Sequence, residues 1–304
     1  MLMGELAALG GAFLWAVASV IYTRVGRAVG PAEMNLLKNV VALAMLGLTL
    51  LFVGQALPDA AGPAVALLLL SGVVGIGLGD TAYFETLNAV GPRRALLLET
   101  LAPPLAALLA LVFLGERLHP GAWLGIAVTV VGVIWVITER APQAGSGTAR
   151  EAAAVAGGRL RRGLLFGLLA ALAQAGGAVL SRAAFLEADV SSLWSAFLRL
   201  AAGAVVLGPW LALTRGRVGG WLRQPGAAAL GGRLLAAITL GTYLALWLQQ
   251  VSLKLTLAGV AQTLFATSPL FVLPFAAWQG ERISLRAALG AGLALGGVAL
   301  LFAF

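Results

Sequence analysis

Five ionisable side chains interrupt long apolar stretches of the sequence: Lys38, Asp80, Glu85, Glu99 and Arg199. Inside a bilayer, each would cost about 3 kcal/mol or more if it faced lipid without a partner. Residues of this kind therefore form ion pairs, carry protons or recognise charged ligands. Their types and positions define the chemistry that the sequence offers.

Three of these residues lie at a similar depth. Counted at 1.5 Å per residue from the nearest loop, Lys38, Glu85 and Glu99 are on the order of 10 Å inside the same face, and Asp80 lies deeper. We expect Lys38 to pair with Glu85 or Glu99, with Asp80 as the third candidate. One interpretation is a structural pair that fixes helix packing. The other is a carboxylate that gates the protein or binds a coupling proton.

Arg199 lies about eight residues into its stretch, counted from the opposite face. The second half of the sequence offers amides and hydroxyl groups at the matching positions but no acid. A buried guanidinium without an acid is a candidate for binding an anionic ligand group. The alternative is that Arg199 extends to the membrane interface or binds helix-end carbonyl groups.

Aromatic and amide side chains inside the apolar stretches are further candidates for lining a substrate site. The aromatic candidates are Trp15, Tyr83, Trp194, Tyr243 and Trp247. The amide candidates are Asn39, Gln174, Gln250 and Gln262. Hydrogen bonds between helices are the competing explanation for the amides.

Several kinds of chemistry have no basis in the sequence. It contains no cysteine and one histidine, His119, which lies beside Pro120 in a short loop. A nucleophile–His–acid set, a metal-ligand cluster and a phosphate-binding Gly-x-x-x-x-Gly-Lys-Ser/Thr loop are all missing from it. We therefore expect no enzyme activity, catalytic residue, metal or cofactor.

The composition requires that these residues be held in a membrane. Hydrophobic residues make up 61% of the 304 positions and charged residues 11%, with a mean hydropathy of +0.98. Soluble domains carry roughly 25% charged residues. The net charge of +8 does not indicate nucleic-acid binding, because the arginines lie between the apolar stretches.

A helix needs about 20 apolar residues to cross a bilayer. The sequence contains ten such stretches, at about 6–22, 35–53, 64–87, 95–114, 122–137, 163–180, 193–213, 234–253, 258–277 and 287–302. This predicts an all-α integral membrane protein with ten transmembrane helices. Residues 140–162 are expected to be a flexible linker, and residues 214–233 a basic surface loop.

The two halves of the sequence repeat one motif. At a shift of 165 positions, Gly115-Glu116-Arg117 falls on Gly280-Glu281-Arg282 and Pro104 on Pro269, and with a small further shift Lys38 falls on Arg199. Residues 1–140 and 162–304 are thus predicted to be five-helix repeats, joined by a linker at 141–161. Because five is odd, the second repeat enters the membrane from the opposite side, which makes the repeats inverted.

These motifs resemble those of the EamA family of the drug/metabolite transporter superfamily. The resemblance rests on Ala102-Pro103-Pro104, Ser268-Pro269, the two Gly-Glu pairs, the glycine-rich fifth helices, and the cation in each second helix. It implies a ten-helix secondary active transporter in the cell (inner) membrane. Such a transporter exports a small organic metabolite, such as an amino acid or a related compound, without ATP.

Two other functions remain open at this point. One is a pore or lipid scramblase, and the other is a membrane-embedded enzyme that uses Asp80, Glu85 and Glu99. Inverted repeats favour alternating access, with the substrate site between the halves. We expect the partners to be the lipid bilayer, a small-molecule substrate and a coupling proton, with no nucleic acid.

Charged loops predict the orientation. Fifteen basic residues lie in the loops after odd-numbered helices and three in the loops after even-numbered helices. The positive-inside rule then places the odd-loop face in the cytoplasm and both termini outside.

Overall fold

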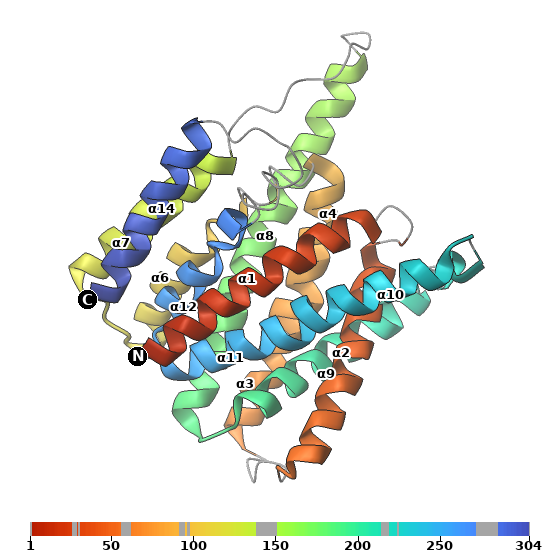
Figure 1. The fold of residues 1–304 in the computed structure, drawn as a ribbon, viewed down its shortest axis with the longest axis horizontal. Helices are drawn as coiled ribbons and strands as arrows, with labels where there is room; N and C mark the ends of the chain where they lie inside the picture. Colours follow the sequence, from red (N-terminus) through yellow and green to blue (C-terminus); the bar gives the residue numbers. More distant parts are fainter. Residues whose placement is uncertain are drawn as a thin grey trace.

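The computed structural model is helical throughout the part of the chain that it describes, which is all but residues 1, 26–28, 30, 56–61, 91–94, 96–97, 138–150, 214–218, 224, 272–284 and 304. Figure 1 shows the helices packed as one bundle. No strand occurs among the described residues.

The described residues of the first half form five main helical segments. They are α1 (Leu2–Val25), α2 (Pro31–Val53), the continuous run α3 (Pro63–Ser71), η1 (Gly72–Gly79) and α4 (Asp80–Val90), then α6 (Ala102–Leu114) and α7 (Pro120–Ile137). The second half begins with α8 (Glu151–Glu187) and α9 (Ser192–Leu213). It continues with η2 (Gly220–Arg223), the run α10 (Ala227–Ala237), η3 (Ile238–Leu244) and α11 (Ala245–Leu255), then α12 (Ala258–Phe265) and α14 (Leu285–Ala303).

Six of the described helical segments are long and apolar enough to cross a membrane. They are Leu2–Tyr22, Glu33–Val53, Pro63–Thr86, Leu160–Glu187, Ser192–Pro209 and Ala227–Leu255. Ala102–Leu114, Pro120–Trp135 and Ala288–Ala303 are shorter apolar helices. The chain is thus a multi-pass membrane protein by length and composition, and the count of ten spans stays a prediction.

The contacts between the halves are reciprocal. α1 packs on α11 and α12, and α8, the equivalent helix of the second half, packs on α4 and α6. The second helices α2 and α9 pack on each other, as do α6 and α12 and the fifth helices α7 and α14 (Figure 1). Reciprocal contacts are the signature of a two-fold relation. They agree with the sequence repeat.

Equivalent glycines allow the closest of these approaches. A methyl group at Gly163 of α8 would overlap Val90 at the end of α4, and one at Gly4 of α1 would come within 2.8 Å of the Cβ atom of Leu255 at the end of α11. Small residues allow helix backbones to approach closely in membranes. Glycine also allows the fifth helices to approach closely, since a methyl group at Gly132 of α7 would overlap the backbone of Ala294 in α14.

Helix boundaries differ from the sequence prediction at two polar stretches. Helix α8 begins at Glu151, inside the stretch expected to be a linker, and in Figure 1 it extends beyond the rest of the bundle. Helix α10 begins at Ala227, inside the expected surface loop. Both segments are rich in alanine, leucine and arginine, which are strong helix formers whether or not lipid surrounds them. A search for apolar stretches does not detect helical extensions that contain charged residues.

The fourth helices are interrupted, which the sequence analysis did not predict. In the first half, a turn at Thr100 and Leu101 precedes α6, whose second residue is Pro103. In the second half, α12 ends at Phe265 and a helical turn resumes at Ser268, next to Pro269. Proline lacks the N–H group that a continuous helix needs and fits best in the first turn of a helix. Each proline motif therefore begins a new helical piece.

The third helix of each half contains a π-helical stretch, η1 in the first and η3 in the second. The two stretches occupy corresponding positions, because a shift of 164 positions in this part of the repeats brings Gly77 onto Gly241 and Asp80 onto Leu244. π-Helical turns are rare and occur frequently at functional sites. The side chains around η1 and η3 are therefore candidates for a functional site.

Candidate functional site

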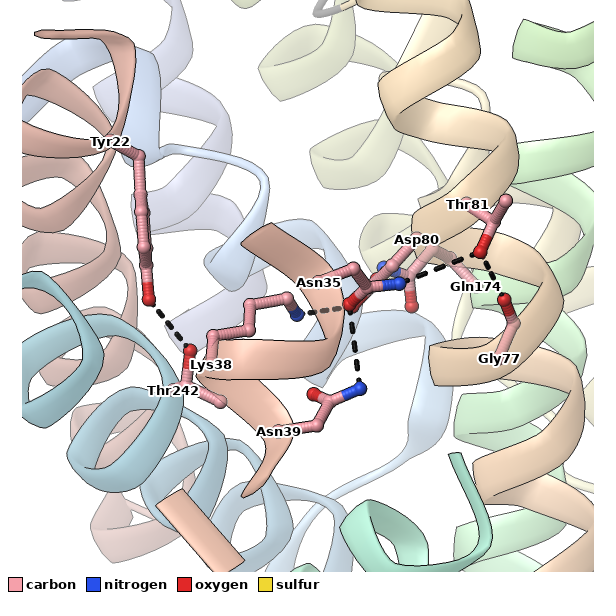
Figure 2. Close-up of polar contacts among 9 residues, drawn as sticks. All are labelled: Tyr22, Asn35, Lys38, Asn39, Gly77, Asp80, Thr81, Gln174 and Thr242. Atoms are coloured by element: carbon pink, nitrogen blue, oxygen red, sulfur yellow. Dashed lines mark hydrogen bonds and ion pairs between the residues drawn. The ribbon is translucent and has the colours of Figure 1, made fainter. Parts of the chain in front are cut away.

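A buried ion pair lies at the end of η1. Lys38, midway along α2, places its Nζ atom 2.5 Å from Oδ2 of Asp80, the first residue of α4 (Figure 2). The side chains are 5% and 17% exposed. The prediction that Lys38 pairs with an acid is confirmed, but the partner is Asp80 and not Glu85 or Glu99, the two acids expected first.

The other oxygen of Asp80 contacts the second half. Nε2 of Gln174 in α8 donates to Oδ1 of Asp80 at 3.3 Å (Figure 2). The backbone carbonyl of Gln174 accepts a bond from Gln262 of α12, whose Oε1 accepts one from Gln249 of α11. Asp80 thus lies where the two halves meet, at the end of a chain of amide groups. We call Lys38, Asp80 and Gln174 the central polar cluster.

Neighbouring side chains on α2 and α4 form weaker bonds beside the ion pair (Figure 2). Nδ2 of Asn39 lies 3.4 Å from Oδ1 of Asn35, and Nδ2 of Asn35 lies 3.5 Å from Oγ1 of Thr81. Thr81 in turn donates to the carbonyl oxygen of Gly77 in η1. Asn39, an amide candidate for the substrate site, therefore belongs to a set of hydrogen bonds that joins α2 to α4 and η1.

Two tyrosines join the other π-helical stretch to the first half. The hydroxyl group of Tyr22 in α1 lies 3.0 Å from that of Thr242, and the hydroxyl group of Tyr243 lies 2.8 Å from that of Thr49 in α2. Sequence analysis identified Tyr243 but missed the other three residues. Single hydroxyl groups in apolar helices provide too weak a signal for such a prediction.

Arg199 is buried, with 2% of its surface exposed. Its side chain does not extend to the membrane interface, so that part of the alternative is wrong. Two of its guanidinium nitrogens, Nε and Nη1, have no hydrogen-bond acceptor among the described residues. Asp80 lies within electrostatic range of Arg199. This acid belongs to the first half, and the second half itself was expected to offer Arg199 none.

Glu85 lies outside the cluster. It pairs with Arg162 of α8 at 3.0 Å, and both side chains are substantially exposed. Five residues after Asp80, Glu85 points about 140° away from it around the helix, at about 100° per residue. Depth alone could not reveal that direction. Glu99 and Tyr83, by contrast, are within electrostatic range of Asp80.

Three predicted aromatic residues pack against apolar side chains. Trp194, Tyr243 and Trp247 border an apolar core formed largely by α2, α9 and the third helix of the second half. The ring of Trp15 lies 6.3 Å from that of Tyr22, centroid to centroid. Gln250 is buried, and its Oε1 accepts a bond from Ser195 of α9 at 2.8 Å.

The Gly-Glu motif of the first half forms a clamp between the halves. Gly115 ends α6 in a left-handed conformation, with a φ of 66° that favours glycine. Glu116 then places Oε1 2.6 Å from Nε of Arg182 in α8 and accepts a bond from the N–H group of Ala258, the first residue of α12. Arg182 also donates to the carbonyl oxygens of Leu253 and Lys254 at the end of α11. The clamp satisfies polar groups at two helix ends. Glu281, the equivalent of Glu116, lies outside the described residues.

A second ion pair lies near the same end of α11. Lys254 contacts Asp189 at 2.5 Å and the carbonyl oxygen of Val190 at 2.9 Å. The hydrogen bond from Lys254 lowers the pKa of the exposed Asp189 carboxyl. Within the described part of the chain, no group of three or more His, Cys, Asp or Glu side chains is arranged to hold a metal ion.

Comparison with solved structures finds the same fold elsewhere. The crystal structure of another protein superposes with a TM-score of 0.77 over 98% of this chain and 94% of the other, at 21% sequence identity. No curated protein matches the sequence.

A family model gives the assignment. The model of the EamA-like transporter family matches residues 2–138 and again residues 161–303. The two matches coincide with the halves that pack reciprocally and leave out most of the predicted linker. The chain belongs to the EamA-like transporter family, built as two copies of its repeat.

Proposed function

We propose that this protein is a secondary active transporter that exports a small organic metabolite, such as an amino acid or a related compound, with the central polar cluster as its transport site. The observation that carries the proposal is the buried Lys38–Asp80 pair, bonded through Gln174 to the other half. Ionisable groups at membrane depth, facing the interior of a bundle, mark substrate and ion pathways.

Stability alone is a poor reason for such a pair. Taking two charges out of water costs several kcal/mol per ion, and well-packed apolar residues often serve as well or better. Lys38 and Asp80 come from two helices of the first half that both pack on the second half, and Gln174 belongs to the second half. A charged group placed at the interface between moving halves can change partners when they move.

The surrounding backbone supports alternating access. Both third helices carry π-helical stretches, and both fourth helices are interrupted at proline motifs. In transporters with inverted repeats, interrupted helices near the repeat interface form the substrate and ion sites. Asp80 is the carboxylate of the cluster that takes up the coupling proton in this proposal, which would release Lys38.

The proposal is tested by efflux from liposomes that contain the purified protein. The liposomes are loaded with a mixture of the proteinogenic amino acids and their N-acetyl derivatives, and the released solutes are identified by mass spectrometry. We expect one or a few solutes to leave faster than from protein-free liposomes, at rates that saturate with concentration. D80N should lose this flux. E85Q, which alters an exposed acid on the same helix, should retain it.

Two outcomes would contradict the proposal. If no solute leaves faster than from protein-free liposomes, the amino-acid-related cargo is wrong. If all solutes leave at rates that rise linearly with concentration, the protein is a pore.

A further inference from the structure

The guanidinium group of Arg199 has buried N–H donors that find no acceptor among the described residues. Its side chain is buried, and Nε and Nη1 have no acceptor among the described residues. A buried donor that is left unpaired costs about 1–3 kcal/mol, and more when it is charged. Native structures seldom keep such a group without a reason.

Glycines of η1 bring the guanidinium to its position. A methyl group at Gly72 would overlap the backbone of Arg199, and a Cβ atom at Gly75 would lie 3.1 Å from Nη2. The α9 backbone and the arginine side chain therefore both lie against a stretch of helix that has no side chains at these points. The contact at Gly72 leaves no room for a side chain, because the backbone atoms of Arg199 cannot move aside as the end of a flexible side chain can.

A second unpaired donor lies on the same side of α9. Ser195 is one helical turn before Arg199, and residues four apart share a helix face. Its hydroxyl group donates to Oε1 of Gln250, which leaves the buried Nε2 of Gln250 without an acceptor among the described residues. Ser195, which binds Gln250 of α11, and Arg199 are thus about one turn, or roughly 5 Å, apart along α9.

The carboxylate nearest to Arg199 is already engaged. Oδ2 of Asp80 is bound by Lys38 and Oδ1 by Gln174. Lys38 and Arg199 are equivalent residues of the two repeats, yet the position that corresponds to Asp80 in the second half is Leu244. Lys38 therefore has a hydrogen-bonded carboxylate, whereas Nε and Nη1 of Arg199 have none among the described residues.

We infer that Arg199 and the side-chain amide of Gln250 form an anion subsite that binds the carboxylate of the transported solute. This inference rests on the proposed function and adds a substrate class, namely solutes that carry a carboxylate. A guanidinium binds a carboxylate through two parallel, charge-assisted hydrogen bonds. Such a ligand supplies the acceptors that both side chains lack.

The subsite is closed in the conformation described here, because Nε and Nη1 of Arg199 are enclosed by protein. A carboxylate reaches them only when α9 and η1 separate. A ligand that binds only the separated conformation increases its population. The anion is therefore coupled to the movement of the two halves.

The experiment compares acetate with acetamide, which has the same shape and no charge. Thermal unfolding of the purified protein in detergent is followed as each compound is added. We expect acetate to raise the unfolding temperature of the wild type more than acetamide does. R199Q should abolish that difference, and R199K should retain only part of it, because an ammonium group cannot form both bonds. R223Q, which removes an exposed arginine, is the matched control and should behave as the wild type.

Equal shifts for acetate and acetamide in the wild type would overturn the inference, as would an undiminished acetate effect in R199Q. If R199Q does not fold, R199K and the wild-type comparison decide the question. If efflux from liposomes is saturable but acetate does not stabilise the protein more than acetamide does, the subsite is refuted and the transporter function stays in place.

Discussion

At the scale of single residues, the buried charges are shared unequally between the repeats. Both second helices contribute a cation, Lys38 and Arg199, while the first half alone contributes the acid Asp80. This asymmetry was visible in the sequence, because type and spacing identify which residues must be paired. The choice of Asp80 over Glu85 was not visible. It depends on the direction in which each side chain leaves its helix.

The ion pair should show strong coupling. K38M or D80N alone leaves one charge buried without its partner, which costs about 3–5 kcal/mol. The double variant removes both charges and should regain much of that loss. Unfolding free energies of the four proteins, measured under one set of conditions, provide the coupling energy. Additive losses would show that Lys38 and Asp80 do not stabilise each other.

At the scale of helices, glycine contacts fix how closely η1 and α9 approach. G72A should destabilise the fold by about 1–3 kcal/mol, because the added methyl group meets backbone and not a movable side chain. G208A is the matched control, since a Cβ atom there has open space around it. Thermal unfolding of the two variants checks this. Equal behaviour would mean that η1 and α9 are not in tight contact.

The Glu116 clamp should also matter for stability. E116Q removes the charge that Arg182 binds, and we expect a loss of about 1–3 kcal/mol, as for a buried charged hydrogen bond. E187Q changes an exposed acid at the end of the same helix as Arg182 and should have little effect. Unfolding temperatures in detergent give the comparison. If E116Q is as stable as E187Q, the contact between Glu116 and Arg182 does not stabilise the fold.

Helix positions were largely predictable because apolar length and stop signals determine where a helix can cross the membrane. Prolines at 103 and 269 were noted as family motifs, but their effect on the fourth helices was not inferred. The π-helical stretches leave no trace in an apolar, glycine-rich sequence such as that of η1. They depend on packing between distant segments, since Gly75 meets Gly177 of α8, and Gly72 meets Arg199 of α9, only in the folded bundle.

At the scale of the whole molecule, the excess of basic residues on one side predicts the orientation. The chain has no cysteine, so single-cysteine variants report accessibility without background. S146C, in the basic linker, should react in intact cells only with a membrane-permeant reagent. E187C, on the opposite face, should react with an impermeant one. The reverse pattern would invert the orientation, which the positive-inside rule makes costly.

Alternating access between the two halves is the central claim, and counterflow tests it most directly. Liposomes that contain the protein are loaded with an excess of the solute found by efflux, and a trace of the labelled solute is added outside. A carrier that exposes one site alternately to the two sides will accumulate the label inside, transiently above its equilibrium level. The account predicts this overshoot. Entry that rises smoothly to equilibrium, without an overshoot, is the behaviour of a pore and would contradict it.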